Sequence, residues 1–337
     1  MKVLFLSPAP TKLHMGGFTT VARYRDGLQQ LGHVCELHGA DGDGGQQQAL
    51  IDAIGRFQPD IVHAHDVRRC GVQLLGSRTP WVISVSGEDL HQDVIDSEHG
   101  PIVCEVMRRA RRVLVPSEHA AELVAARVPG AASKVDVVAR AATSLPTDGT
   151  DLRRSLGIQR QRFLVFLPGG IRPVKAQHRA ISAIPKLRAA GADIEMIIAG
   201  AVQDEDYARK LQAEVDDTTG VRLMPSLARE RMGAAYADAD VVLNTSVFEG
   251  AAPTILEAGM LGRPVIASDV PGNRALIRHK ETGLLFGDEE SLAKQILALY
   301  RNRTAAGTLG VRVREDFMRR FSADREVAGL LSAYAAA

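Results

Sequence analysis

Short apolar runs alternate along the chain with turns rich in glycine, proline and polar residues, and with longer amphipathic stretches. In the first half, the runs that predict strands are residues 3–6, 34–37, 61–63, 82–85, 113–115 and 135–138. In the second half, they are residues 163–167, 195–198, 221–224, 241–243, 265–267 and 284–286. Because these runs are nearly continuous in apolar character, they predict parallel strands that are covered on both faces.

The amphipathic stretches between these runs predict helices. The helices expected are residues 20–31, 118–126, 177–189, 207–216, 229–236, 254–260 and 292–300, with a last helix at about 321–334. Alternation of strands and helices is typical of an α/β fold with doubly wound parallel sheets. A single sheet of about twelve strands would be unusually wide, so we expect two sheets of about six.

The regular pattern lapses at residues 139–150, which are rich in alanine, threonine, proline and glycine. We therefore predict two Rossmann-like domains, residues 1–145 and 146–320, and a C-terminal helix at about 321–337 that is able to pack back on the first domain. Ligands of such sheets bind beyond the carboxyl ends of the strands, so two sheets facing each other would enclose a binding cleft.

The composition narrows the classes of function. The chain has 337 residues, and 41 Lys and Arg against 40 Asp and Glu give a net charge of +1. This balance argues against bulk binding to nucleic acid, which requires a basic excess. No apolar run reaches the roughly 18 residues that cross a bilayer, and the first residues are patterned as a strand and not as a signal peptide. We expect a cytoplasmic protein; peripheral contact with a membrane surface and the oligomeric state stay open.

Three cysteines, Cys35, Cys70 and Cys104, lie far apart in the sequence and form no Cys-x-x-Cys pair. This spacing predicts buried, reduced thiols in place of a disulfide framework or a zinc site. His63 has apolar neighbours in the run 61–63, and we predict that it is a buried strand residue.

Glycine pairs follow the first predicted strand of each half. Residues 16–17 open a helix, where backbone N–H groups are able to approach an anion, although a plain turn is the alternative. The dinucleotide fingerprint GxGxxG is absent from this turn, so a nicotinamide cofactor is disfavoured. In the second half, glycines 169–170 precede Arg172 and Lys175, two cations that suit a diphosphate; a solvated basic turn is the alternative.

The segment 246–258, after the predicted strand 241–243, carries two carboxylates. Glu249 precedes a loop of small residues, and Glu257 lies one turn into the next predicted helix. The loop N–H groups and the helix N-terminus favour an anion between them. A diphosphate that has a sugar on one side and a ribose on the other fits this layout.

Several stretches together resemble one family. Glu249-x7-Glu257 resembles the E-x7-E motif of retaining GT-B glycosyltransferases, the large family four in particular. Four further stretches of this chain resemble motifs of the same family: EAGMLGRPVIAS at 257–268, TGLLF at 282–286, Gly170-x-Arg172-x-x-Lys175, and DIVHAH at 60–65. These matches lie in order along nearly the whole chain. The resemblance implies two Rossmann-like domains that face each other across a cleft, with the donor held mainly by the second.

The resemblance also implies a role for each matching position. Arg172 and Lys175 would clamp the donor diphosphate and stabilise it as it leaves, and Glu249 would contact a sugar hydroxyl; these three are the catalytic candidates. Glu257 would bind the ribose hydroxyls. The other donor-side candidates are Gly16 and Gly17 across the cleft, Leu227 beside the base, and Gly250, Ala251, Ala252, Thr254 and Ile255 through their backbone.

Three positions depart from the family pattern. Ser86 stands where many members carry a histidine, Ala176 stands where the pair Lys-Gly is usual, and residues 271–274 read PGNR in place of GG-x-x-E. The first departure puts a catalytic histidine at that place in doubt. The combination of RPVK and PGN resembles the glycosyltransferase-one-domain-containing proteins and, more faintly, selenosugar synthases.

The function predicted from this resemblance is transfer of a sugar, with retention, from a UDP- or GDP-linked donor to an unidentified small-molecule, glycan or lipid-linked acceptor. No metal is expected, and no other cofactor, because the nucleotide sugar counts as a co-substrate and not as a cofactor. The acceptor-side candidates, each with a surface or structural role as the alternative, are His14, His65, Asp66, Ser86, Glu88 and Asp89. A sugar-nucleotide epimerase or hydrolase of the same fold, and a non-catalytic sugar-nucleotide-binding protein, stay open as alternatives.

Overall fold

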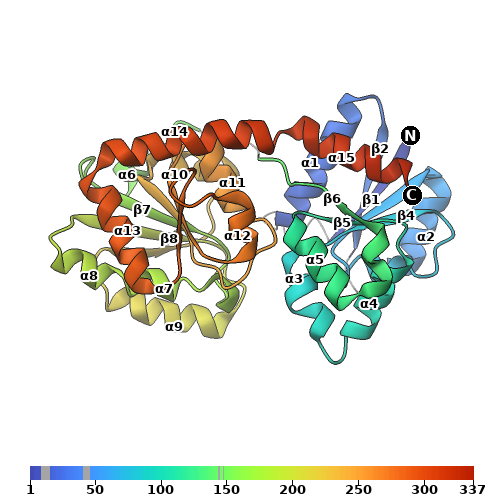
Figure 1. Cartoon of the computed structure of the whole chain (residues 1–337), viewed down its shortest axis with the longest axis horizontal. Coiled ribbons are helices and arrows are strands. Elements are labelled where there is room, and N and C mark those ends of the chain that lie inside the picture. Colours follow the sequence, from blue (N-terminus) through green and yellow to red (C-terminus); the bar gives the residue numbers. More distant parts are fainter. Residues whose placement is uncertain (9–15, 41–45, 143–144, 147) are drawn as a thin grey trace. The chain divides into compact units, whose positions relative to one another are not determined.

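The structure, a computed structural model, describes residues 1–8, 16–40, 46–142, 145–146 and 148–337 (Figure 1). The chain divides into two compact units. Unit 1 comprises Met1–Ala141 and Phe321–Ala337, and unit 2 comprises Ala142–Arg320. The C-terminal segment therefore belongs to the same unit as the N-terminus.

Unit 1 is built on a parallel sheet with strand order β2-β1-β3-β4-β5-β6. Its strands are β1 Lys2–Pro8, β2 Val34–Ala40, β3 Ile61–His65, β4 Trp81–Ser84, β5 Val113–Val115 and β6 Val135–Val137. Its α-helices are α1 Gly16–Gln30, α2 Gln46–Phe57, α3 Gly87–His91, α4 Gly100–Arg109, α5 Glu118–Arg127 and α15 Ala323–Ala335. All five residues of β3 are buried, as expected of a strand covered on both faces.

The C-terminal helix α15 packs on α1 in unit 1. A Cβ at Gly27 would lie 2.5 Å from Val327 Cγ2, so the absence of a side chain at Gly27 allows the two helices to approach closely. Arg23 donates two hydrogen bonds, of 2.6 and 2.7 Å, to the buried carboxylate of Glu326. Unit 1 therefore includes the end of the chain as an integral part of its core.

Unit 2 repeats the architecture with strand order β12-β11-β10-β7-β8-β9, again parallel. Its strands are β7 Phe163–Pro168, β8 Ile194–Ala199, β9 Val221–Met224, β10 Val241–Asn244, β11 Val265–Ser268 and β12 Leu284–Phe286. Its α-helices are α6 Leu152–Ser155, α7 His178–Ile181, α8 Ile184–Ala189, α9 Glu205–Asp216, α10 Arg229–Asp238, α11 Pro253–Met260, α12 Pro271–Leu276, α13 Glu289–Arg301 and α14 Arg303–Arg320. Two doubly wound α/β sheets, as predicted, are thus confirmed.

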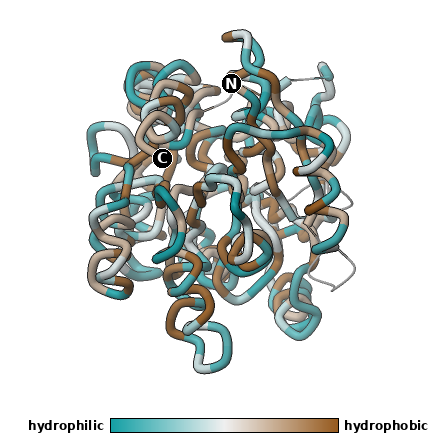
Figure 2. Tube along the Cα trace, turned by 90° about the vertical axis from the view of Figure 1, so that its right-hand side faces the viewer, coloured by the Kyte–Doolittle hydropathy of each residue, from teal (hydrophilic) through white to brown (hydrophobic). Residues whose placement is uncertain are grey.

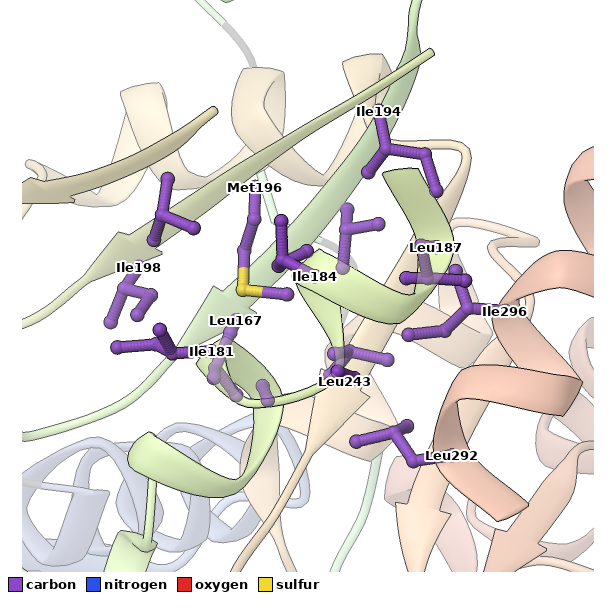
Figure 3. Packing of buried hydrophobic residues seen from close by; sticks show 14 of the residues in the cluster. Leu167, Ile181, Ile184, Leu187, Ile194, Met196, Ile198, Leu243, Leu292 and Ile296 are labelled. Carbon is purple, nitrogen blue, oxygen red and sulfur yellow. The ribbon is translucent and has the colours of Figure 1, made fainter. Parts of the chain in front are cut away.

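The core of unit 2 lies between the sheet and the helices that follow β7 and β12 (Figure 3). Met196 of β8 lies beside Ile184 of α8, Ile198 belongs to the same strand and cluster, and Ile296 of α13 lies near Leu187. All five side chains are at most 1% exposed. Elsewhere along the trace, helices alternate hydrophobic and hydrophilic residues, the pattern of a helix with one buried face (Figure 2).

One helical prediction was wrong, and one long helix was not predicted. The single helix expected at 177–189 is two short helices, α7 and α8, because Pro185 stands in the first turn of α8 and has no N–H to continue a preceding helix. The long helix α14 was not predicted, since two glycines weaken its pattern. One of them, Gly310, is required by packing: a Cβ there would lie 2.1 Å from the carbonyl oxygen of Gly262.

The prediction of a buried side chain is confirmed for His63, Cys35 and Cys70 and is wrong for Cys104. Cys35 and Cys70 are buried free thiols, and Cys104 is a half-buried one. His63 is fully buried in β3. Among the described residues, no helix has both the length and the apolar character needed to cross a bilayer.

Candidate active site

The strand order of unit 2 reverses between β7 and β10, which are neighbours in the sheet although β8 and β9 separate them in the chain. In open α/β sheets, ligands bind beyond the carboxyl ends of the strands at such a switch point. The segment after β7 carries Arg172 and Lys175, and the segment after β10 carries Glu249. The fold therefore brings the three predicted catalytic candidates to one edge of one sheet.

The loop after β7 turns sharply against the end of β8. Gly169 has φ +151°, which a side chain would disfavour, and a Cβ at Gly200 would lie 1.9 Å from the carbonyl oxygen of Gly169. Arg172 is extended and precedes the short 3₁₀ turn Pro173–Lys175. The glycines thus let the chain cross the strand end and present Arg172 and Lys175 beyond it.

Ala176 ends this turn in the left-handed conformation, with φ 46° and ψ 44°. A residue with a side chain costs about 1–2 kcal/mol there relative to glycine, which explains the glycine usual after the lysine in the family that the chain resembles. Contacts with the β10 loop hold the turn: Thr245 Oγ1 donates to the carbonyl of Lys175 at 2.7 Å, and Val247 N donates to the carbonyl of Val174 at 2.9 Å.

Glu249 is the centre of a polar cluster at this edge. Its Oε1 atom accepts from Lys175 Nζ at 2.7 Å, from Ser246 Oγ at 2.7 Å and from Asn244 Nδ2 at 3.0 Å. The Glu249 side chain is 9% exposed and that of Lys175 is 20% exposed, so the ion pair is largely shielded from solvent. Charge-assisted hydrogen bonds of this kind are stronger than those between neutral groups.

Burial by itself raises the pKa of Glu249, but the positive charge of Lys175 and the hydrogen bonds from Lys175, Ser246 and Asn244 outweigh it, so the pKa is lowered. Glu249 is therefore ionised at neutral pH, and its negative charge compensates that of Lys175. A carboxylate in this state accepts hydrogen bonds from hydroxyl groups and cannot donate them.

Glu257 lies in α11, which begins at Pro253 after the loop 250–252. Its Oε2 atom accepts a 2.8 Å hydrogen bond from the hydroxyl of Tyr236, a fully buried residue of α10. Burial, followed by the charge of Glu257 and this hydrogen bond, raises the pKa of Tyr236 well above its usual value, so Tyr236 keeps its proton. The Tyr236 hydroxyl consequently remains a hydrogen-bond donor at neutral pH, and it orients the Glu257 carboxylate by donating to it.

The remaining donor-side candidates of unit 2 surround the start of α11 or follow β9. Ala251, Ala252 and Ile255 are buried, Gly250 and Thr254 are half-buried, and the Ile255 N–H donates to the Ala252 carbonyl at 3.2 Å. Leu227 is 7% exposed and precedes α10. These residues lie at the carboxyl edge of the sheet, and the backbone contacts expected of them stay predictions.

Two functional candidates escaped prediction from the sequence. Asn244 is the last residue of β10, and Asn273 lies in the first turn of α12, fully buried. Asn273 Nδ2 donates to Asn244 Oδ1 at 3.1 Å and to the carbonyl of Ser268 at 3.0 Å. The signal was the departure at 271–274: a polar residue in an apolar setting beside a conspicuous motif.

Asp238 and Asp240 form an Asp-x-Asp sequence at the opposite, amino-terminal edge of β10 and β7. Asp238 Oδ2 accepts from the N–H of Leu152 at 2.6 Å, and Asp240 Oδ2 accepts from the N–H of Leu164 at 2.7 Å and from Arg153 Nη2 at 2.6 Å. These carboxylates fasten α6 to the sheet and lie away from the Lys175–Glu249 pair.

In unit 1, the candidates lie at the carboxyl edge of β3 and β4. His65 ends β3 and is 5% exposed; a Cβ at Gly17 would lie 3.0 Å from its imidazole, so α1 starts directly against His65. Burial, followed by the charges of Arg140, His63 and Arg23, lowers the pKa of His65 to about 3. His65 is therefore a neutral hydrogen-bonding group at physiological pH. Gly16 is the first residue of α1.

Ser86 and Asp89 cap α3 reciprocally. The Ser86 hydroxyl accepts from the Asp89 N–H at 3.2 Å, and Asp89 Oδ2 accepts from the Ser86 N–H at 2.6 Å. Asp89 Oδ1 also accepts from the N–H of Val67 at 3.0 Å, and the residue is 1% exposed. Both oxygens of Asp89 thus bind backbone, which is the geometry of a structural capping box.

Asp66 has φ +85°, and its side chain accepts from the Arg69 N–H at 2.8 Å. Burial raises the pKa of Asp66, against the hydrogen bond and the charge of Arg69. Glu88 lies beside it in the first turn of α3 and is half-buried. His14 lies outside the described residues.

Part of unit 2 matches a known protein family. Residues 162–302 match the family model described as Glycosyl transferases group 1. Glycosyltransferase 1 domain-containing protein 1 of Xenopus tropicalis is 27% identical over 300 residues, which cover 87% of this chain and 86% of that protein. A D-inositol 3-phosphate glycosyltransferase of Rhodococcus erythropolis is 31% identical over 163 residues, or 45% of this chain and 37% of that protein. The match therefore spans less than half the length of the second relative.

Solved structures match the whole chain in fold. Anabaena Alr3699/HepE in complex with UDP-glucose superposes with a TM-score of 0.83 at 17% identity, covering 100% of both chains. Sucrose-phosphate synthase from Thermosynechococcus elongatus gives a TM-score of 0.84 at 17% identity, covering 99% of this chain and 98% of that one.

With two doubly wound sheets and these matches, the protein is a glycosyltransferase enzyme with the GT-B fold. Within that class, residues 162–302 of unit 2 are similar to the Glycosyl transferases group 1 family.

Proposed function

We propose that unit 2 binds a nucleoside diphosphate sugar at Lys175 and Glu249 and that the enzyme transfers the sugar with retention at the anomeric carbon. The observation that carries the proposal is the 2.7 Å contact between Lys175 Nζ and Glu249 Oε1 at the carboxyl edge of β7 and β10. The contact places Lys175, the cation proposed to bind the diphosphate, beside Glu249, the carboxylate proposed to bind a sugar hydroxyl.

In this proposal, Lys175 keeps a fixed position because Glu249 binds one of its three ammonium protons. The remaining protons are directed at the diphosphate, and Arg172, three residues earlier, adds a planar fork that suits phosphate oxygens. As the bond between the sugar and the diphosphate breaks, negative charge develops on the leaving phosphate. Two preorganised cations stabilise that charge without reorganisation.

Glu249, ionised and held by Ser246 and Asn244, accepts a hydrogen bond from a hydroxyl of the donor sugar. Glu257, oriented by Tyr236, accepts from the ribose hydroxyls. The backbone at 250–252 contacts the sugar, and the N–H group of Thr254 in the first turn of α11 donates to a phosphate oxygen. These contacts place the donor for attack, which is the main task of an enzyme in group transfer.

Retention is proposed to occur by attack on the same face of the sugar that the diphosphate leaves, with the leaving phosphate taking the acceptor's proton. We further propose that the reaction needs no metal, because Lys175 and Arg172 supply the positive charge. The acceptor is a small molecule, a glycan or a lipid-linked species, bound by unit 1 through residues such as His65.

UDP-glucose is the first donor to test, because the HepE structure similar in fold contains UDP-glucose; GDP-linked sugars are the second. Each donor is incubated with the enzyme and a panel of sugar, polyol and lipid acceptors in excess chelator, and the product's anomeric configuration is read by NMR. A product with the configuration of the donor supports the proposal. Inversion, loss of activity in chelator, or release of free sugar irrespective of acceptor contradicts it, the last in favour of a hydrolase.

A further inference from the structure

Glu249 is held by an uncharged group whose own orientation needs explaining. Asn244 presents Nδ2 to Glu249 Oε1 at 3.0 Å. An asparagine amide is nearly symmetric in shape, and turning it by 180° would present Oδ1 to the carboxylate, replacing an attraction by a repulsion. Some other contact must therefore decide which end of the Asn244 amide faces Glu249.

That contact comes from α12. Asn273 Nδ2 lies 3.1 Å from Asn244 Oδ1, and the backbone N–H of Ser246 lies 3.3 Å from the same oxygen. Both are donors, so Oδ1 must face them and Nδ2 must face Glu249. Asn244 is 4% exposed and Asn273 is fully buried, so water does not compete for these positions.

The orientation of Asn273 is fixed in turn by groups of β11. Its Nδ2 lies 3.0 Å from the carbonyl oxygen of Ser268, which is able only to accept. The Ser268 hydroxyl, 3.1 Å from the same nitrogen, donates its proton to the carbonyl of Ser246 at 2.5 Å, so it also accepts from Asn273. A chain of defined direction runs from the Ser268 carbonyl through the two amides to Glu249.

We propose that Asn273 is a positioning residue of the donor site: it fixes the Asn244 amide and thereby holds Glu249 ready for the donor sugar. The inference rests on the proposed function for the sugar contact, whereas the hydrogen-bond relay itself does not depend on it. The backbone agrees with this link, because a Cβ at Gly272 would lie 2.0 Å from the Glu249 carbonyl oxygen, which brings the start of α12 directly against Glu249.

Because of this chain of hydrogen bonds, the pKa of Glu249 should depend on whether Asn273 holds the Asn244 amide in place. The hydrogen bond from Asn244 is one of the interactions that lower the pKa of Glu249, together with the charge and hydrogen bond of Lys175 and the hydrogen bond of Ser246. Lys175, from the loop after β7, is a charged group that lowers the pKa of Glu249. Loss of Asn273 leaves Lys175 in place but removes the shorter of the two contacts that hold Asn244 Oδ1, and the 3.3 Å contact from the Ser246 N–H remains. We expect the Asn244 amide to turn and the pKa of Glu249 to rise.

The test compares Asn273→Ala, Asn244→Ala and the double variant. A matched control is Asn302→Ala, which removes the acceptor for the Ala305 N–H at 2.9 Å at the start of α14 and so perturbs unit 2 away from the site. Asn273→Cys, which is close to asparagine in volume and carries only a weak S–H donor, replaces Asn273→Ala if the latter does not fold. Thermal unfolding of each variant establishes that it is folded.

The first readout is the titration of the Glu249 carboxyl by ¹³C NMR in the absence of donor, with the signal assigned by its loss in Glu249→Gln. We expect Asn273→Ala and Asn244→Ala to raise the pKa of Glu249 by similar amounts, the double variant to add nothing further, and Asn302→Ala to leave it unchanged. An unshifted titration in Asn273→Ala, or additive shifts in the double variant, overturns the relay.

The second readout is the KM for the nucleotide sugar, expected to rise about tenfold in Asn273→Ala, the scale of one lost hydrogen bond to a charged group. If the wild-type enzyme uses no nucleotide sugar, the proposed function fails while the NMR titration still decides the relay. If the wild type turns over and Asn273→Ala has the same KM as Asn302→Ala, the positioning role fails while the proposed function stands.

Discussion

Lys175 Nζ lies 2.7 Å from Glu249 Oε1, although the two residues are 74 positions apart in the chain. The contact exists because β7 and β10 are neighbours at the switch point of the unit 2 sheet, so the loops that leave them converge. An ion pair that is largely shielded from solvent holds both side chains in one geometry. The proposed donor chemistry follows from this pair.

Removal of the Lys175 ammonium is expected to lower turnover of the nucleotide sugar by about 100-fold, the scale of one lost donor to a developing charge. Lys175→Ala also leaves Glu249 without its cation, so donor binding weakens as well. The control is Lys186→Ala, an exposed residue of α8 in the same unit. Steady-state kinetics of both variants check the prediction; equal turnover in the two would show that Lys175 does not clamp the diphosphate.

A side chain at Gly272 is expected to displace Glu249. A Cβ there would lie 2.0 Å from the Glu249 carbonyl oxygen, closer than any real contact, so the backbone of the loop must shift. Gly272→Ala should lower kcat/KM by tenfold or more, since a misplacement of about 1 Å costs up to 10²-fold.

The matched control is Gly307→Ala in α14, where a Cβ would meet nothing within 4 Å. Because alanine is the better helix former by about 1 kcal/mol, this variant should unfold at a higher temperature and retain full activity. Unimpaired kinetics of Gly272→Ala would mean that the loop does not position Glu249.

The ionisation of Glu249 should make the free energy of unfolding depend on pH in the acidic range. Its pKa in the folded protein is lowered below the usual 4.5 because the charge of Lys175 and the hydrogen bonds to it outweigh the opposing effect of burial. Its stabilising contribution is fully present above pH 4.5 and is lost as the pH falls through the folded-state pKa. Urea unfolding of wild type and Glu249→Gln should therefore differ most near neutral pH and converge in acid. The difference for Glu214→Gln, an exposed residue of α9, should be small at every pH.

His63 should make the free energy of unfolding depend on pH as well, over a range that extends to higher pH than the range set by Glu249. Burial lowers its pKa to about 3, so the folded protein keeps it neutral, whereas the unfolded chain protonates it near 6.5. The unfolded state thus binds more protons between these values, and stability falls as the pH drops from 6.5 toward 3. His63 also contacts Tyr334 Oη at 2.6 Å and Ser84 Oγ at 2.7 Å, which tie α15 to the sheet.

The corresponding variant is His63→Gln, with the exposed His178→Gln as control. His63→Gln is expected to be less stable at neutral pH but to lose less stability on acidification, because the buried imidazole is gone; His65 retains its share of the effect. Free energies of unfolding at several pH values provide the measurement. An unchanged slope would contradict the assignment of this dependence to His63.

The strands and the main site residues could be predicted because their signals are local. The apolar runs predict the strands, and Arg172, Lys175 and Glu249 belong to short sequence motifs. Asn244 and Asn273 could not be found this way, since Asn244 belongs to no motif and Asn273 stands in the departure at 271–274. Their contact appears only when β10 and β11 lie side by side. The pair α7 and α8 was predicted as one helix because periodicity was weighed above the effect of Pro185.

The unit 1 candidates show the same limit. Asp89 and Ser86 follow a strand, as acceptor-side residues should, yet their side chains close a capping box around the start of α3. The position of a polar residue in the sequence indicates which edge of the sheet it occupies. Its partners, which decide whether it caps a helix or faces a ligand, depend on the packing of the neighbouring elements.

The most direct test of the central claim is calorimetric titration of UDP-linked and GDP-linked sugars into the wild type, Lys175→Ala and Lys186→Ala, all in excess chelator. The account predicts that the wild type and Lys186→Ala bind one of these donors with equal affinity and that Lys175→Ala binds it at least tenfold more weakly. Binding that is indifferent to Lys175, or the absence of binding by any of these nucleotide sugars, would contradict the claim that Lys175 and Glu249 form the donor site.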